Sequence, residues 1–444
     1  MKNITLNDDQ ENALTKLQLF LDDDKQCMAL LEGPAGSGKS TLVSSLIDKV
    51  MENSVIGKIA ITSPTNKALK VVKQMINPEH KDRIQFSTLH SLLGLKYKID
   101  KDGKEVFERD FKSQCKLAFF ELVIVDETSM VADELFHQLN DQNHNQTKII
   151  FVGDSNQINP VNHIHSIPMM EDKRELYDIL HLKLTKIVRQ AENNPIIKYS
   201  QQVLKDTFEY SSGTKEVNEG KGVVMLGTSQ HDVVISLLKY YFCSEEFDKN
   251  ANHAKLLAWR NVTVDNYNTI IRNLKYGKGM PKIVNGEKLI AERPIKNNDG
   301  DIIFATNEDL EIKTIEIKIK KLYNNDYKYY KCQVTGDDLT DEIHIIHESS
   351  TALFNKTLKM LADEAKAEKD TGKRVDKWKK YYSMVENFSS VGYNYAITTH
   401  CGQGSTYNNA FVIYSDIDLN RREDEKKRIL YTALTRPKHM LYIM

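Results

Sequence analysis

The stretch Leu30-Leu31-Glu32-Gly33-Pro34-Ala35-Gly36-Ser37-Gly38-Lys39-Ser40-Thr41 decides the fold class. It contains the pattern G-x-x-x-x-G-K-[ST] between an apolar run and a helical pattern, which is the context that a phosphate-binding loop requires. Glycines let backbone N–H groups wrap a phosphate, and the first turn of the following helix favours negative charge. The sequence therefore predicts a nucleotide site formed by Gly33, Pro34, Ala35, Gly36, Ser37, Gly38, Lys39, Ser40 and Thr41.

Two carboxylates follow a second apolar run further along the chain. Leu122-Val123-Ile124-Val125 ends in Asp126 and Glu127, and adjacent carboxylates at the end of a buried strand repel each other unless a cation shares them. We predict that Ser40 and Asp126 hold Mg²⁺, that Lys39 reaches the β- and γ-phosphates, and that Glu127 positions or activates water. The expected cofactors are ATP and Mg²⁺.

Short apolar runs alternate with helical patterns around these motifs, which is typical of parallel βαβ units. Strands are expected at 27–31, 58–62, 122–125 and 149–152, with helices at 40–51 and 66–75. The same α/β pattern returns with strands at 256–259, 410–414 and 440–444 and a helix at 264–274. The predicted fold class is therefore α/β, with two domains of this type.

The domain division follows from changes in the predicted strand and helix pattern along the chain. We expect a first domain at 1–190, with a β-hairpin inserted at 93–116, and a second domain in two parts, 191–282 and 391–444. The hairpin is predicted from Asp102-Gly103, because this pair tolerates the positive φ angles of a tight turn. The segment 283–390 carries strand patterns at 313–321 and 327–334 and a charged helical stretch at 352–382, and is predicted to be an inserted small β-barrel with helices.

Composition excludes several classes of protein. The 61 Lys and Arg against 62 Asp and Glu give a net charge of -1, so a nucleic-acid partner would need a local groove. Five scattered cysteines form no C-x-x-C pair, which argues against zinc and disulfides. The first ten residues hold no apolar signal core, and no long apolar run follows. We expect a soluble protein of the cytoplasm, or of the host cytoplasm for a phage-encoded chain, with no membrane partner.

With these residues located, the chain resembles the superfamily-one helicases of the B branch, the RecD-like group. The most specific match is Gly153-Asp154-Ser155-Asn156-Gln157-Ile158-Asn159-Pro160-Val161, whose Gln-x-x-Pro-Val ending belongs to this branch. Tyr431-Thr432-Ala433-Leu434-Thr435-Arg436 resembles the motif that supplies an arginine finger. The resemblance covers nearly the whole chain and implies two RecA-like P-loop NTPase domains, the first carrying a hairpin pin and the second the barrel.

The resemblance also implies contacts to the nucleotide beyond the loop. Gln10 matches the glutamine that reads adenine, and Gln157 the one that senses the γ-phosphate. Arg189 and Arg436 match arginines that reach the γ-phosphate, and such a finger is typically worth roughly 10³–10⁵ in rate. Gly404 lies in a motif that couples nucleotide to DNA.

Residues expected to contact single-stranded DNA come from four further motifs: Pro64, Thr65 and Asn66; Thr88 and His90; Asn261; and His400, Gln403 and Thr406. By chemistry alone these are groups that bond to phosphates without reading sequence, and helix capping by Ser63 or Thr65 is the alternative. In the last motif Cys401 replaces the usual lysine, which puts a basic contact near the strand in doubt.

The predicted function is an ATP-dependent DNA helicase that moves on single-stranded DNA, 5′→3′ by resemblance alone, and separates duplex DNA. It is expected to act as a monomer on fork or tailed duplexes, with single-strand-binding or replication proteins as partners. A translocase that remodels nucleoprotein without unwinding and a binding module without hydrolysis stay open as alternatives, as does RNA. The hairpin is either a duplex-splitting pin or surface decoration, and the aromatic and lysine residues at 323–331 are either a strand-binding surface or ordinary sheet.

Overall fold

The first lobe of the molecule is built on a six-stranded parallel sheet. The computed structural model describes residues 6–53, 56–100, 102, 105–109, 114–144, 147–160, 165–188, 194–297, 302–337 and 339–444. The strand order is β3-β2-β6-β7-β1-β8, with β1 at Met28–Glu32, β2 at Ile59–Ser63, β3 at Ile84–Thr88, β6 at Leu122–Val125, β7 at Lys148–Gly153 and β8 at Ile179–Lys183. Strands β1, β2 and β6 are buried along their whole length, as expected for a parallel sheet covered by helices on both faces.

The helices of this lobe pack against those faces. They are α1 at Asp8–Asp22, α2 at Lys39–Asn53, α3 at Asn66–Met75, α4 at Leu89–Leu92, α5 at Asp133–Gln142 and α6 at Glu171–Leu176. The expected helix at 66–75 and strand at 122–125 have the observed bounds, and the other expected elements of this lobe differ by one or two residues at their ends. The predicted α/β class is confirmed.

A second six-stranded sheet forms the other lobe, in the order β19-β11-β20-β21-β10-β9. Its strands are β9 at Lys215–Asn218, β10 at Lys221–Met225, β11 at Ala254–Ala258, β19 at Ala396–Thr398, β20 at Tyr407–Val412 and β21 at Pro437–Ile443. All pairs are parallel except β9 with β10. Its helices are α8 at Pro195–Leu204, α9 at His231–Phe242, α10 at Glu245–Lys249, α11 at Asn261–Tyr276, α14 at Thr399–Gly402, α15 at Tyr414–Ile417 and α16 at Glu423–Leu434.

The chain between β11 and β19 forms a separate antiparallel sheet of order β17-β16-β15-β12-β18. It comprises β12 at Lys288–Ala291, β15 at Asp309–Leu322, β16 at Asn325–Thr335, β17 at Thr340–Ile346 and β18 at Val391–Tyr393, with the small pair β13 at Ile295–Lys296 and β14 at Ile302–Phe304 beside it. Among the described residues no ladder joins β17 to β18, so closure into a barrel stays a prediction. The sheet also includes β18, which follows the expected end of the insertion at 390.

The aromatic residues of this inserted sheet point inward. Tyr327, Tyr329 and Tyr330 are at most 9% exposed, and they pack in hydrophobic clusters with α12 at Glu348–Ala367 and with neighbouring strands. These three rings are therefore core residues of an ordinary sheet, which decides against the strand-binding surface for them. The charged stretch expected at 352–382 forms two helices, α12 and α13 at Thr371–Val385.

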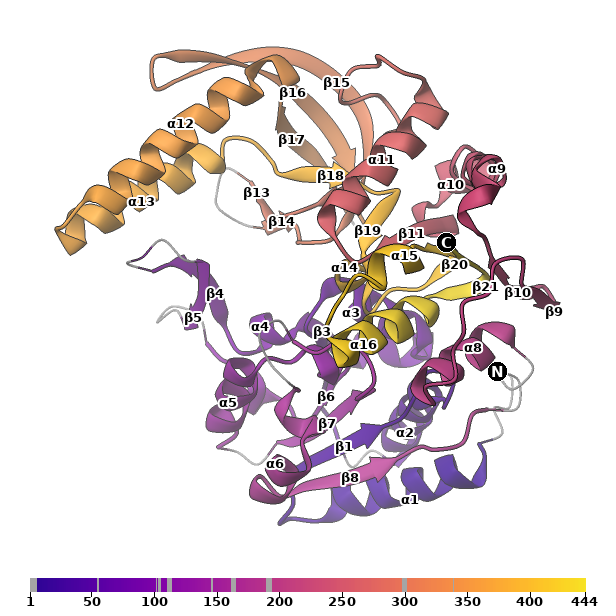
Figure 1. Ribbon diagram of the computed structural model, residues 1–444. Helices are drawn as coiled ribbons and strands as arrows, with labels where there is room; N and C mark the ends of the chain where they lie inside the picture. The colour runs from indigo at the N-terminus through magenta and orange to yellow at the C-terminus, as the bar shows by residue number, and fades with distance from the viewer. Residues whose placement is uncertain are drawn as a thin grey trace.

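The predicted hairpin is present as β4 at Leu95–Ile99 paired with β5 at Glu105–Arg109. It projects from the first lobe toward the tips of α12 and α13 (Figure 1). Within the described ranges no helix is both long and apolar enough to cross a membrane. Helix α16 of the second lobe lies against the first lobe, near the carboxyl ends of its strands (Figure 1).

Candidate nucleotide site and nucleic-acid interface

The phosphate-binding loop connects the carboxyl end of β1 to the first residue of α2. Gly36 and Gly38 both have φ of 82°, a region that L side chains rarely adopt. A Cβ atom on Gly38 would lie 2.1 Å from Nε2 of Gln10, so glycine is required by both backbone and space. Lys39 donates from Nζ to the loop carbonyls of Gly33 and, at 3.2 Å, Pro34. Ser40 and Thr41 continue into the first turn of α2.

Gln10 is fixed against this loop from α1. Its Oε1 accepts the Asn7 N–H at 3.0 Å, its own N–H donates to Asn7 Oδ1, and its Nε2 donates to Ser37 O at 3.0 Å. The first two bonds form a capping box, which satisfies two otherwise unpaired donors at the start of a helix. The glutamine expected to read adenine is thus 3% exposed and touches the loop backbone.

The acidic pair follows β6 at the same edge of the sheet. Glu127 has φ 51° and ψ 44°, a left-handed conformation that is rare for a residue with a Cβ and that clusters at functional sites. Burial raises the pKa of Asp126, and the charge of Glu127 raises it further. Burial also raises the pKa of Glu127, while the cations Arg436 and Lys39 lower it. Two negative charges on Asp126 and Glu127 are therefore only partly neutralised by the protein, and the pair is suited to bind an additional cation.

Asp154 and the turn after β7 form the third part of the site. Asp154 Oδ1 accepts the Asn156 N–H at 3.0 Å and its Nδ2 at 2.9 Å, which shapes the turn that leads to Gln157. Gln157 is 6% exposed. Because β1, β6 and β7 are parallel, their carboxyl ends bring the loop, the acidic pair and this turn to one edge, where ligands of such sheets bind.

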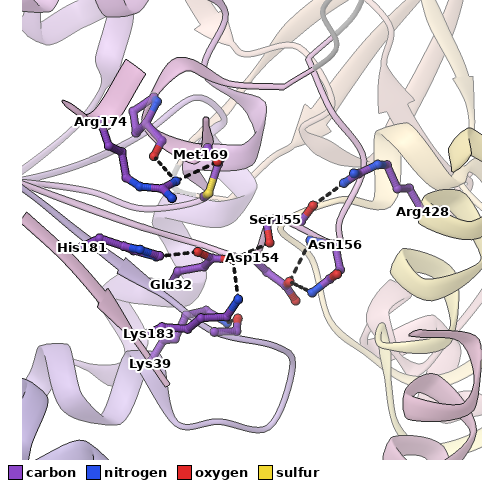
Figure 2. A network of polar contacts seen from close by, with 12 residues as sticks. Glu32, Lys39, Asp154, Ser155, Asn156, Met169, Arg174, His181, Lys183 and Arg428 are labelled. Atoms are coloured by element: carbon purple, nitrogen blue, oxygen red, sulfur yellow. Dashed lines mark hydrogen bonds and ion pairs between the residues drawn. The ribbon is translucent and has the colours of Figure 1, made fainter. Parts of the chain in front are cut away.

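Glu32, which the sequence analysis did not select, connects two of these parts. It is the last residue of β1, and its carboxylate accepts from His181 Nε2 at 2.7 Å and from the Ser155 hydroxyl (Figure 2). Although burial raises its pKa, these hydrogen bonds and the Lys183 charge lower it to about 2. An acidic residue that ends an otherwise apolar strand was the available signal.

Several side chains of the second lobe reach the turn after β7. Gln403 Nε2 donates to Ser129 Oγ and to Ile158 O, both at 3.2 Å, and lies 3.5 Å from Gln157 Oε1. Thr432 Oγ1 accepts the Ile158 N–H at 3.2 Å. Arg428 Nη1 donates to Ser155 O (Figure 2). It also donates to Gln157 O at 3.3 Å. The two lobes are thereby joined by polar contacts beside the nucleotide site.

Gln403 and Gly404 lie at the junction of the two lobes. Gln403 was expected to contact DNA, but it is 3% exposed and its amide bonds to the first lobe at the nucleotide side. Gly404 was expected at the nucleotide, yet a Cβ there would lie 2.8 Å from Ala68 Cβ of α3. Gly404 has φ 73°, so the chain turns there and the two residues have different neighbours. Their roles at the DNA and at the nucleotide stay predictions.

Arg436 follows α16 and is 6% exposed. Its guanidinium donates to Thr432 O at 3.0 Å, Ser405 O at 3.2 Å and Thr435 Oγ1 at 3.0 Å. Its charge acts on Glu127 of the first lobe. Arg189 lies outside the described residues, although Val188 just before it donates its N–H to Gly36 O at 3.0 Å.

The residues expected to contact DNA lie at the ends of strands or in the first turns of helices. Thr65 and Thr88 cap helices, because their hydroxyl oxygens accept the N–H groups of Ala68 and Ser91 at 3.3 and 3.2 Å. Each hydroxyl hydrogen stays available to donate to a phosphate. The remaining members are half-buried or exposed: Pro64, Asn66, His90, Asn261, His400 and Thr406. Burial lowers the pKa of both His90 and His400.

Asn261 opens onto a cavity of about 700 Å³ between α11, β18, β19 and the inserted sheet. Asn307 and Cys401 also line it, and Cys401 Sγ donates to Asn307 Oδ1 at 3.1 Å. Beside them, Lys67 Nζ of α3 lies 2.7 Å from Asp309 Oδ1, and Lys255 Nζ donates to Asn394 Oδ1 at 2.6 Å. Lys67 and Lys255 therefore already lie near Cys401, the position at which the family motif has a lysine.

The surroundings of Cys401 predict that a lysine there is costly. Burial and the Lys67 charge together lower the pKa of Lys255 to about 7, although Asp309 raises it. A third ammonium would therefore share the single Asp309 carboxylate with two lysines. We expect Cys401→Lys to lower the free energy of unfolding by about 3 kcal/mol, measured by urea denaturation, with Cys401→Ala as a milder control. A Lys variant of parental stability whose DNA affinity rises at low salt would instead place position 401 on the strand.

Both ends of the chain match models of known protein families. Residues 5–222 match the family model of an AAA domain, and residues 393–444 match that of a UvrD-like helicase C-terminal domain. The chain is 26% identical to the ATP-dependent DNA helicase dda of Enterobacteria phage T4, covering 98% of both chains. It is 27% identical to the uncharacterized protein R530 of Acanthamoeba polyphaga mimivirus, covering 99% of both.

A more distant relative and a solved structure agree. The RecBCD enzyme subunit RecD of Buchnera aphidicola is 23% identical over 98% of this chain and 73% of its own. The crystal structure of Pif1 helicase from Candida albicans shares the fold with a TM-score of 0.52 at 16% identity, covering 99% of this chain and 94% of that one.

Two α/β lobes that meet at a phosphate-binding loop define an ATP-hydrolysing motor of two RecA-like domains. Over nearly its whole length the chain is therefore similar to the superfamily-one B branch of helicases, the group that holds the RecD-like and Pif1-like enzymes.

Proposed function

We propose that this chain is an ATP-dependent helicase that moves along single-stranded DNA and separates duplex DNA. The observation that carries the proposal is the junction of the two lobes. Gln403 and Arg428 of the second lobe bond to the turn that carries Gln157, and the Arg436 charge acts on Glu127. Because the nucleotide site is shared between lobes, binding and hydrolysis of ATP would change the distance between them, and that change can drive stepping.

The proposed roles at the nucleotide follow from these positions. The loop from Gly33 to Thr41 would hold the phosphates, with Lys39 at the β/γ end, and Gln10 would read adenine. Glu127 would accept the proton of the attacking water, Gln157 would sense the γ-phosphate, and Arg436, with Arg189, would offset the charge that develops on it.

Ser40 and Asp126 would hold Mg²⁺. Within the described part of the chain no group of three or more His, Cys, Asp or Glu side chains is arranged to hold a metal alone. One hydroxyl and one carboxylate fit an ion that takes its other ligands from phosphates and water, as Mg²⁺ usually does. The half-buried Asp126 and Glu127 side chains, whose pKa values burial raises, are consistent with such a cation. When bound, the ion would neutralise charge on the β- and γ-phosphates.

The DNA path is proposed along the strand ends and first helical turns that carry the expected DNA contacts in the two lobes. Pro64, Thr65 and Asn66, Thr88 and His90, and His400 and Thr406 would bond to phosphates, with Asn261 at the 700 Å³ cavity. Movement in the 5′→3′ direction, fork or tailed duplex substrates, action as a monomer, association with single-strand-binding or replication proteins, and a place in the cytoplasm or host cytoplasm belong to this proposal.

One assay series tests the proposed function. ATP hydrolysis is measured with and without single-stranded DNA or RNA, and unwinding is measured on duplexes tailed at the 5′ or the 3′ end. We expect hydrolysis to rise with DNA and unwinding only from the 5′ tail, with ADP in place of ATP as the inactive control. Hydrolysis without unwinding would leave a translocase, and absence of hydrolysis would reject the motor.

The hairpin β4–β5 is proposed to be the pin that separates the duplex. The Phe107 ring packs on His90 with centroids 4.3 Å apart, so the hairpin is joined to one of the proposed DNA contacts. Oδ1 of its turn residue Asp102 lies 3.8 Å from Arg374 Nη2 of α13, so the hairpin also approaches the inserted part of the chain.

Replacing residues 99–106 with a short Gly-Ser link should lower the unwinding rate more than tenfold. DNA-stimulated ATP hydrolysis should stay within about twofold of the parent, because the nucleotide site is formed by strand ends elsewhere. Displacement of a protein block from single-stranded DNA is the matched control and should survive. Unwinding at the parental rate would assign duplex separation to another element.

A further inference from the structure

The hydroxyl of Tyr431 joins two parts of the nucleotide site that belong to the other lobe. Tyr431 lies on α16 and is fully buried. Its oxygen accepts the Ala35 N–H of the phosphate-binding loop at 2.8 Å, and its hydrogen is donated to Asp154 Oδ2 at 2.7 Å. One group of the second lobe is thereby in contact with both the loop and the turn after β7.

The neighbours of Tyr431 on α16 make the contact well defined. Arg428 and Thr432, one turn before and one residue after it, bond to the segment between Ser155 and Ile158. Residues three or four apart share one face of a helix, so this face of α16 is applied to the first lobe over more than a turn. Tyr431 extends the contact to the loop itself.

The hydrogen bond from Tyr431 affects the turn after β7, because its acceptor Asp154 also positions that turn. Asp154 Oδ1 accepts both the backbone N–H and the side-chain amide of Asn156, and these bonds shape the turn that leads to Gln157. Burial raises the pKa of Tyr431 well above its usual value, and the Asp154 charge raises it further, so the phenol stays a donor. The geometry of the Ala35 N–H and of the turn is therefore set by where the second lobe lies.

We propose that Tyr431 is a positioning residue for ATP hydrolysis, which fixes the loop and the Gln157 turn only when the second lobe is in place. The inference rests on the proposed motor function and deepens it. Small displacements at the γ-phosphate end of such a site cost large factors in rate, and loss of an ordinary hydrogen bond corresponds to roughly tenfold. Nucleotide binding relies mainly on the loop and is affected less.

The test is Tyr431→Phe, which keeps the ring and removes the hydroxyl. We expect kcat for DNA-stimulated hydrolysis to fall about tenfold, while KM for ATP and the affinity for ADP stay within twofold. Tyr442→Phe is the matched control, because Tyr442 is a buried phenol of the same lobe whose hydroxyl bonds to Tyr241 at 2.8 Å, away from the loop. Its kcat should be parental, and both variants should lose a similar amount of thermal stability.

A double-mutant comparison with Asp154→Asn tests the route of the effect. If Tyr431 acts through Asp154, the double variant should have the same kcat as the less active of the two single variants. A parental kcat for Tyr431→Phe, an equal loss of nucleotide affinity, or additive losses in the double variant would each overturn the inference. In those cases hydrolysis by the parent would leave the proposed function standing, whereas an inactive parent would reject both.

Discussion

Arg436→Ala is expected to lower kcat for ATP hydrolysis about 10³-fold with little change in the affinity for ATP. The charge that Arg436 would meet is greatest in the transition state, so its removal affects rate rather than ground-state binding. The measurement is kcat in steady-state hydrolysis with saturating single-stranded DNA, with ATP affinity determined separately.

Because Arg436 is buried and bonds to Thr432 and Ser405, a general loss of folding has to be separated from a loss of catalysis. Arg436→Lys keeps a cation but not the planar fork, and should fold with a smaller defect than Ala. Thermal unfolding of both variants provides the control. Equal losses of kcat and of ATP affinity would identify Arg436 as a ground-state contact.

Glu127→Gln should keep ATP binding and lower hydrolysis by about 10²–10⁴-fold, because shape is retained and the base is removed. Since burial raises the pKa of Glu127 and the base has to be ionised, kcat/KM of the parent should fall as pH drops through a value above the usual range of a glutamate. That acidic limb should be absent from the residual activity of the variant.

Glu127→Asp is the second variant, because it keeps the carboxylate and moves it by one methylene. It should retain more activity than Gln if the charge is what matters. Loss of ATP binding in Glu127→Gln would show instead that the left-handed turn at this residue serves the fold of the loop.

The sequence sufficed for the parts of the site that are local. Gly33 to Thr41 and Asp126-Glu127 follow strands whose apolar residues are uninterrupted, and the observed strands β1 and β6 are fully buried. The α/β class follows from the same pattern. The roles assigned to these residues, and the domain boundaries, stay predictions.

Contacts across the junction could not be predicted, because no local pattern encodes them. Tyr431 and Ala35 are 396 positions apart, and Tyr431 is one of many aromatic residues in the chain. The neighbours of Gln403 could not be predicted either, because the turn at Gly404 gives adjacent residues of one motif different neighbours. Glu32 was overlooked because a charged residue at a strand end is usually solvated, whereas here His181 and Ser155 enclose it.

The order of the second sheet has a consequence for biosynthesis. Strand β21 lies between β20 and β10, yet it comprises Pro437–Ile443, after every other strand of that sheet. The first lobe has all its described strands once residue 183 has left the ribosome, and domains generally fold as units, the N-terminal one first. The second lobe cannot complete its sheet until β21 has been synthesised, because β10 and β20 both lack the strand that lies between them. Chains arrested a few residues before the end of β21 should therefore carry a folded first lobe and an exposed, chaperone-binding second one.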